Sequence, residues 1–162
     1  MVTVTPSVRP TWTDLARRGL ATAAVASVAN ALLLTLVLGT GLVEPFAPLS
    51  YPPVVFLSAA GAVAATLVYG LLTGRVTDAD RTFFRVAVAV LVASFLPDIG
   101  LLYVDPGATV PGVLVLMLMH VVVAAVCVAS LTELGWGVPK GTDRTGPKSD
   151  RATAVRALFR MP

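Results

Sequence analysis

Charged residues are scarce in this 162-residue chain: Asp, Glu, Lys and Arg make up 13% of it, while 56% of the residues are hydrophobic. A soluble domain has about 25% charged and about 45–50% apolar residues. So few charges on so apolar a chain cannot cover the surface of a soluble globule. The composition therefore excludes a cytosolic enzyme, a nucleic-acid-binding domain and a disordered protein, and it predicts an integral membrane protein.

Cysteine and histidine are almost absent as well, with one residue of each type. The lone Cys127 cannot form an internal disulfide, no CxxC or zinc pattern exists, and we interpret this thiol as a small apolar filler. A haem with two histidine ligands would need a second histidine from another chain, because His120 is alone. Met117 and Met119 lie beside His120 in a pattern open to copper, but packing is the better interpretation. We therefore predict no cofactor and no metal site.

The few charges leave two long stretches almost free of charge, residues 19–74 and 86–132. A bilayer core about 30 Å thick needs about 20 apolar residues per helix, so each stretch is long enough for two passes. Glycine and proline clusters divide the stretches. We expect an all-α bundle of four transmembrane helices within residues 1–134, at about 13–42, 53–72, 78–103 and 110–134. A flexible linker over 135–150 and a basic amphipathic tail helix over 151–162 are expected to follow.

The first expected helix carries its own start signal, because Thr11 with Asp14 three residues later fits a capping box. A cleaved signal peptide is the alternative interpretation of this segment. Its apolar run of about 20 residues exceeds the 7–15 residues of a signal-peptide core, and no clear cleavage site follows. We expect a retained membrane anchor.

All twelve Lys and Arg residues fall in the N-terminal segment, around the connection of the second and third helices, and in the C-terminal tail. The positive-inside rule then predicts both termini in the cytoplasm, in a multi-pass protein of the plasma membrane. The net charge of +3 points to anionic lipid headgroups at the cytoplasmic face rather than to nucleic acid, for which no motif exists. The tail presents a basic face for this lipid, with Arg151, Arg156 and Arg160.

Polar side chains inside the bilayer need a reason, because no water is present to receive them. Asp98 follows Pro97, which removes a backbone donor and predicts a kink or an early end of the third helix. If that helix ends at Leu96, Asp98 is an ordinary acid at the outer interface. If the helix continues to Tyr103, Asp98 lies about 8 Å inside at 1.5 Å per residue. The candidate intramembrane site consists of Asp98, His120, Asn30 and Ser94.

His120 is expected near mid-membrane, where it can form an interhelical hydrogen bond or serve as a proton relay or ligand. Asn30 lies at a similar depth, so the two side chains could meet across the bundle. Ser94 is one turn before Asp98 and can bond within its own helix. Asp98, His120 and Asn30 are thus expected to converge in the outer half, although no third titratable group continues a path to the cytoplasm.

Small residues mark the expected helix contacts. Gly61 with Ala65 and Gly70 with Gly74 form small-xxx-small pairs, which let helix backbones approach closely. Internal packing or a dimer would use them, so a homo-oligomer or a larger membrane complex is open.

Three strings resemble a known family: SFLPD at residues 94–98, GATV at 107–110 and LMLMHVV at 116–122. The family comprises small four-helix membrane proteins of actinobacteria and haloarchaea, catalogued only as a domain of unknown function. The resemblance covers roughly residues 15–134. It implies a four-pass fold and no activity, and it suggests Pro97, Asp98 and His120 as the first residues to mutate.

No catalytic constellation accompanies these residues: we find no nucleophile with a base and orienting group, no paired carboxylates and no phosphate-binding glycine loop. The sequence predicts a non-enzymatic integral membrane protein that acts as a subunit or partner in a membrane assembly. One alternative is a small oligomeric transporter or proton-linked channel that uses Asp98 and His120. A second is a cofactor-binding membrane redox subunit that uses His120.

Overall fold

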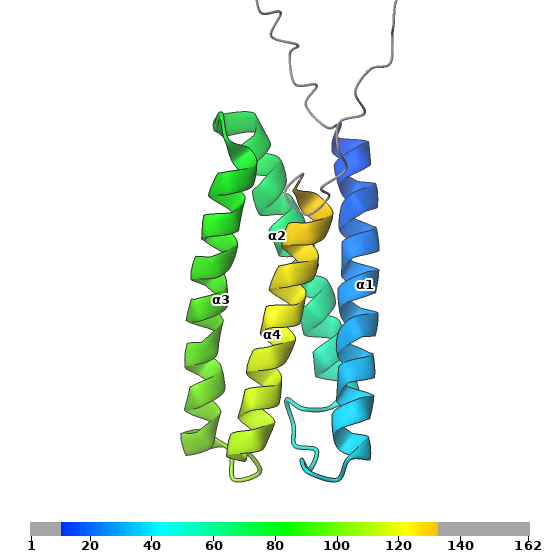
Figure 1. Cartoon of the computed structure of the whole chain (residues 1–162), viewed down its shortest axis with the longest axis vertical. Helices are drawn as coiled ribbons and strands as arrows, with labels where there is room; N and C mark the ends of the chain where they lie inside the picture. The colour runs from blue at the N-terminus through cyan, green and yellow to red at the C-terminus, as the bar shows by residue number, and fades with distance from the viewer. Residues whose placement is uncertain (1–10, 133–162) are drawn as a thin grey trace, which may run out of the picture.

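The computed structural model describes residues 11–132, which form four helices running up and down in turn (Figure 1). They are α1 (Trp12–Gly39), α2 (Tyr51–Arg75), α3 (Ala79–Val104) and α4 (Val110–Leu131). All four are long and apolar enough to cross a membrane. The expected all-α fold with four membrane-spanning helices is therefore confirmed for this part of the chain, and the protein is a multi-pass membrane protein.

Two expected features lie outside the described residues. They are the linker over 135–150 and the tail helix over 151–162, which contains Arg151, Arg156 and Arg160. The bounds of the helices differ from the expected ones by a few residues. α1 stops at Gly39, three residues early, where Gly41 adopts a left-handed φ of 68°. α2 is longer than expected at both ends.

Side chains cap three of the helix starts, where backbone amides have no partner within the helix. The Thr11 hydroxyl oxygen accepts from the Asp14 amide at 3.2 Å, which is the first bond of the capping box expected from the sequence. The Asp14 carboxylate accepts from the Thr11 hydroxyl at 2.6 Å. Asp78 accepts from the Arg81 amide at 3.2 Å, and Thr109 caps α4. α2 starts with prolines in its first turn, a position that needs no amide donor.

The two ends of the bundle differ in charge. The start of α1, the connection between α2 and α3 and the end of α4 lie together at one end (Figure 1). We call it the basic end, because it contains all the basic residues that the structure describes, Arg17, Arg18, Arg75, Arg81 and Arg85. The α1–α2 and α3–α4 connections form the opposite end, which we call the far end.

Helices α1, α2 and α4 pack closely and enclose two apolar clusters. The cluster nearer the basic end contains Leu15, Ala23, Ala62, Tyr69, Phe83, Cys127 and Leu131. The cluster nearer the far end includes side chains of the α1–α2 connection and contains Leu34, Val43, Phe46, Leu49, Val54, Leu116 and Met119. Apart from Phe83 of α3, the helical members of both clusters belong to α1, α2 and α4, so these three helices form the core.

Helix α3 stands at the edge of the bundle (Figure 1). It packs along α4 and to a smaller extent against α2, and within the described chain it makes no contact with α1. Only two of its side chains are buried, Phe83 and Asp98. Near the basic end, the Tyr69 hydroxyl donates to Asp80 at 2.7 Å, and the rings of Tyr69 and Phe83 meet edge to face at 5.3 Å. This contact attaches the start of α3 to α2.

The small residues proposed as packing positions have different surroundings. A methyl group added at Gly70 would collide with Leu15 and Trp12 of α1, so Gly70 is at a tight α1–α2 contact. A methyl group added at Gly61 would meet only Val123 at 3.6 Å, and one added at Gly74 would meet nothing within 4 Å. Ala65 is partly buried against the cluster nearer the basic end.

Candidate functional site

Asp98 lies inside α3, because the helix continues through Pro97 to Val104. The alternative in which the helix ends at Leu96 is therefore wrong. Ending a helix inside hydrocarbon would leave several backbone groups unpaired, whereas continuing past a proline sacrifices one hydrogen bond. Asp98 is six residues before the end of α3, about 9 Å along the axis at 1.5 Å per residue. Its carboxylate is buried, with 6% of the residue exposed.

His120 of α4 is the direct neighbour of this carboxylate. Its Nδ1 lies 3.1 Å from the Asp98 Oδ2 atom and 2.9 Å from the Leu116 carbonyl oxygen. With Asp98 ionised, both neighbours of Nδ1 are acceptors, so we assign the ring proton to Nδ1. In the neutral ring Nε2 then carries a free lone pair. The pair joins α3 to α4 and leaves an acceptor on the other edge of the imidazole.

Asn30 of α1 is the third polar residue at this depth and is 2% exposed. Its side-chain amide donates to the Ser58 hydroxyl at 2.9 Å and to the Met119 carbonyl at 3.3 Å. Asn30 thus bonds to the residue before His120, and no hydrogen bond to the imidazole itself is observed. The bonds of Asn30 tie α1 to α2 and α4.

One buried oxygen atom of this region, Oδ1 of Asn30, has no hydrogen-bond partner among the residues that the structure describes. Oδ2 of Asp98 lies 3.1 Å from Nδ1 of His120, which carries the ring proton, so the imidazole occupies this acceptor. The Ser94 hydroxyl is already used, because it donates to the Leu91 carbonyl of its own helix at 2.7 Å, as expected from the sequence. The site therefore has more free acceptors than free donors.

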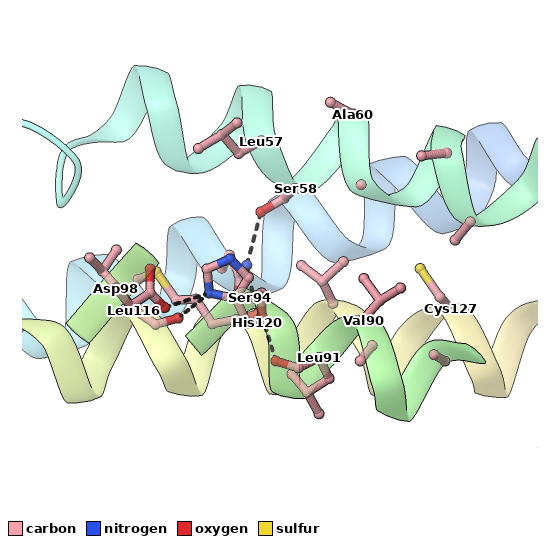
Figure 2. Close-up of a pocket in the computed structure, with 18 of the residues that line it drawn as sticks. Leu57, Ser58, Ala60, Val90, Leu91, Ser94, Asp98, Leu116, His120 and Cys127 are labelled. Atoms are coloured by element: carbon pink, nitrogen blue, oxygen red, sulfur yellow. Dashed lines mark hydrogen bonds and ion pairs between the residues drawn. The ribbon is translucent and has the colours of Figure 1, made fainter. Parts of the chain in front are cut away.

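These residues line one end of a groove of about 570 Å³ between α2 and α3, with α4 as its floor. We call it the α2–α3 groove. Figure 2 shows Ser58, Ser94, Asp98 and His120 gathered together, and Val90 and Cys127 farther along the same hollow. Most of the remaining lining is apolar, and much of it is small or branched: Ala60, Gly61, Ala64, Ala65, Val68, Val86, Ala87, Val90 and Val123.

The two side chains of the His120–Asp98 pair differ in their exposed fraction. The His120 side chain is 41% exposed, while the Asp98 side chain behind it is 9% exposed. In Figure 2 the imidazole stands between the ribbons of α4 and α2. Of the small residues along α2, Ala60, Gly61 and Ala64 are exposed. A molecule in the surrounding medium can therefore reach the imidazole from the side of the bundle, whereas the carboxylate supports the ring from behind.

The arrangement combines a few polar side chains with an apolar lining. Toward the basic end, the groove beyond Ser94 is apolar up to Cys127, so its described lining offers no chain of titratable groups. No group of three or more metal-ligating side chains is found among the described residues. A largely apolar pocket with a few convergent polar groups is typical of small-molecule sites.

Two parts of the site were missed by the sequence analysis. Ser58 accepts the hydrogen bond of Asn30, and its signal was a polar residue on the second helix at the depth of Asn30. The groove itself had no signal, because the small residues along α2 suit close packing and open space equally well.

A model of the protein family DUF6069, described as a family of unknown function, matches residues 10–134. The match covers all four helices. No curated protein matches the chain, and no solved structure matches it.

Proposed function

The chain belongs to the family of unknown function DUF6069, which brings no activity with it, and we propose a function from the geometry of the α2–α3 groove. In this proposal the protein is a non-enzymatic subunit or partner in an assembly of the plasma membrane. It takes part by holding a molecule of the membrane in the groove. The observation that supports the proposal is the polar cluster of Asp98, His120 and Asn30 inside an otherwise apolar groove.

The energetic argument is that such a cluster is costly. A carboxylate at the centre of a bilayer costs about 2.5–3.5 kcal/mol on insertion scales, and ionisable residues inside membranes are functional candidates by default. Packing alone does not need this cluster, because α3 is also attached to α2 through Tyr69 and Asp80. Binding supplies a reason for polar groups that face a groove.

Native mass spectrometry of the full chain in mild detergent tests the proposal. We expect a bound molecule or a stoichiometric partner on the unaltered protein, and its loss in Ala64→Phe, which fills the groove. Val63→Phe is the matched control, because Val63 is the neighbouring exposed residue of α2 and does not line the groove. Equal spectra for the two variants, or no bound species and no self-association, would contradict the proposal.

The proposed orientation places both termini in the cytoplasm. It is supported by the basic end, where all described Lys and Arg residues lie, since positive residues favour the cytoplasmic side. In this orientation the tail with Arg151, Arg156 and Arg160 meets anionic lipid headgroups. In a Cys127→Ala background, we expect an impermeant maleimide to label Ser50→Cys on intact cells and Thr142→Cys only after permeabilisation. The reverse pattern would overturn the orientation.

A second candidate function is proton-linked transport by an oligomer, favoured by the 3.1 Å contact between Asp98 and His120. The apolar lining toward the basic end counts against it. Proton flux into vesicles that contain the protein distinguishes the two functions. Transport requires that Asp98→Asn and His120→Ala reduce the flux, and an unchanged flux removes this candidate.

A further inference from the structure

The ligand of the α2–α3 groove can be described more narrowly from the shape and chemistry of its lining. We infer that the groove binds a single-chain amphiphile of the bilayer whose uncharged polar end carries a hydroxyl group. The hydroxyl donates to Nε2 of His120, and the hydrocarbon chain lies along α2 and α3 toward the basic end. This inference rests on the proposed function and specifies its ligand.

The groove is long and narrow enough for a hydrocarbon chain. The lining of α3 extends from Phe83 to Asp98, about 22 Å at 1.5 Å per residue. The volume of the groove is about 570 Å³, which is within the usual range of small-molecule pockets. Room of this size and length fits one extended hydrocarbon chain.

The polar end of the groove calls for a donor. Asn30 Oδ1 is a buried acceptor without a hydrogen-bond partner in the described chain. With the ring proton on Nδ1, Nε2 of the partly exposed His120 side chain is a further acceptor. The side-chain amide of Asn30 and the hydroxyl of Ser94 are already engaged. A hydroxyl group can donate to Nε2 of His120, whereas a ligand with acceptors alone would leave that atom unsatisfied.

Charge disfavours an anionic headgroup. Asp98 is the one acidic residue in the described lining of the groove, and its carboxylate, when ionised, repels phosphate and carboxylate groups. All the arginines that the structure describes lie at the basic end, so none of them is near Asp98. The atom within reach of a ligand is the half-exposed imidazole rather than the carboxylate behind it. An uncharged hydroxyl group can bond to the exposed imidazole without approaching the buried carboxylate.

Depth and access agree with a ligand from the bilayer. Asp98 is about 9 Å, and His120 about 15 Å, from the far ends of their helices at 1.5 Å per residue. The polar end of the ligand would therefore lie below the far interface, with its chain directed across the midplane. Ala60, Gly61 and Ala64 are exposed along α2, so the ligand can enter sideways from the hydrocarbon.

The test uses three probes with the same 16-carbon chain: 1-hexadecanol, hexadecanoate and hexadecane. Each is added to the full chain in phosphatidylcholine nanodiscs, and retention is measured by native mass spectrometry after release. We expect one hexadecanol per chain. Retention of the other two probes should be lower by about fivefold or more, the effect of one hydrogen bond. His120→Phe should remove the preference, while His120→Gln, which keeps an acceptor, should retain part of it.

Ala64→Phe should reduce retention of hexadecanol, and Val63→Phe should not. Equal retention of the three probes by the unaltered protein would overturn the inference, as would a preference that survives in His120→Phe. A protein partner displaced by Ala64→Phe, with no probe retained, would also overturn it and leave the proposed function standing. If neither a probe nor a partner depends on Ala64, both the inference and the proposed function fall.

Discussion

Helix α2 has two faces rich in small residues, and they behave in opposite ways. On the face toward α1, a methyl group added at Gly70 would come within 2.5 Å of Leu15, and one added at Gly19 of α1 would come within 2.6 Å of the Thr66 side chain. On the face toward the α2–α3 groove, a methyl group added at Gly61 would meet only Val123 of α4, at 3.6 Å. The first interface is closed and the second is the α2–α3 groove. A small residue thus permits close approach but does not cause it, since the position of the partner helix decides the outcome.

The sharpest way to break this contrast is Gly19→Ala. The added methyl group collides with Thr66, whose hydroxyl is held by the Ala62 carbonyl at 2.7 Å and whose branched side chain has little freedom. Overpacking of this kind costs about 1–3 kcal/mol, and we expect about 2 kcal/mol of lost stability. A thiol-reactive dye measures it in detergent, because buried Cys127 reacts as the protein unfolds. An unchanged stability of Gly19→Ala would show that the α1–α2 interface can accommodate the added methyl group.

The next largest effect is expected for Asn30→Ala. It removes two buried hydrogen bonds that connect α1 with α2 and α4, at 2.9 and 3.3 Å. Polar contacts between membrane helices contribute about 0.6–2 kcal/mol, so we expect about 1.5 kcal/mol of destabilisation in the same assay. Ser27→Ala is the control, since its bond to the Val55 carbonyl is exposed. Equal losses in the two variants would mean that burial adds nothing to the Asn30 contact.

A smaller effect is expected where α3 meets α2 near the basic end. Tyr69→Phe deletes the hydroxyl that donates to Asp80 and retains the ring that contacts Phe83. We expect about 1 kcal/mol of lost stability, the net worth of one hydrogen bond. Hydrogen exchange of the first turns of α3 should also become faster. Unaltered exchange there would show that this bond does not hold α3.

The smallest effect on stability is expected for a substitution on the α2–α3 groove. Gly61→Ala places a methyl group in the α2–α3 groove with only an ordinary contact, and alanine favours the helix over glycine by about 1 kcal/mol. We expect stability to be unchanged or raised by about 0.5 kcal/mol. A loss comparable with that of Gly19→Ala, measured by the same dye assay, would show that α2 is tightly packed at Gly61 and that the groove is not open there.

The sequence was a good guide wherever the signal is local. Four apolar segments and the cap at Thr11 follow from composition and short spacings, and the structure contains them all. Asn30, Asp98 and His120 were expected to converge, and all three line one groove.

The partners were less readable, because they depend on how each helix is rotated about its axis. His120 contacts Asp98, whereas Asn30 bonds to Ser58. Pro97 left the end of α3 undecided, because a proline can either end a helix or remain within it with one backbone hydrogen bond missing. The distance between α2 and α3, which makes the groove, is a property of the assembled bundle alone.

The pairing of Asp98 with His120 has a consequence for biogenesis. The two residues are 22 positions apart, so Asp98 leaves the ribosome first and enters the membrane machinery before its partner exists. The connection between α3 and α4 comprises only residues 105–109, and α4 is the most apolar of the four helices. A short connection and an apolar successor favour insertion of α3 and α4 as one hairpin. The carboxylate and the imidazole would then enter the lipid together.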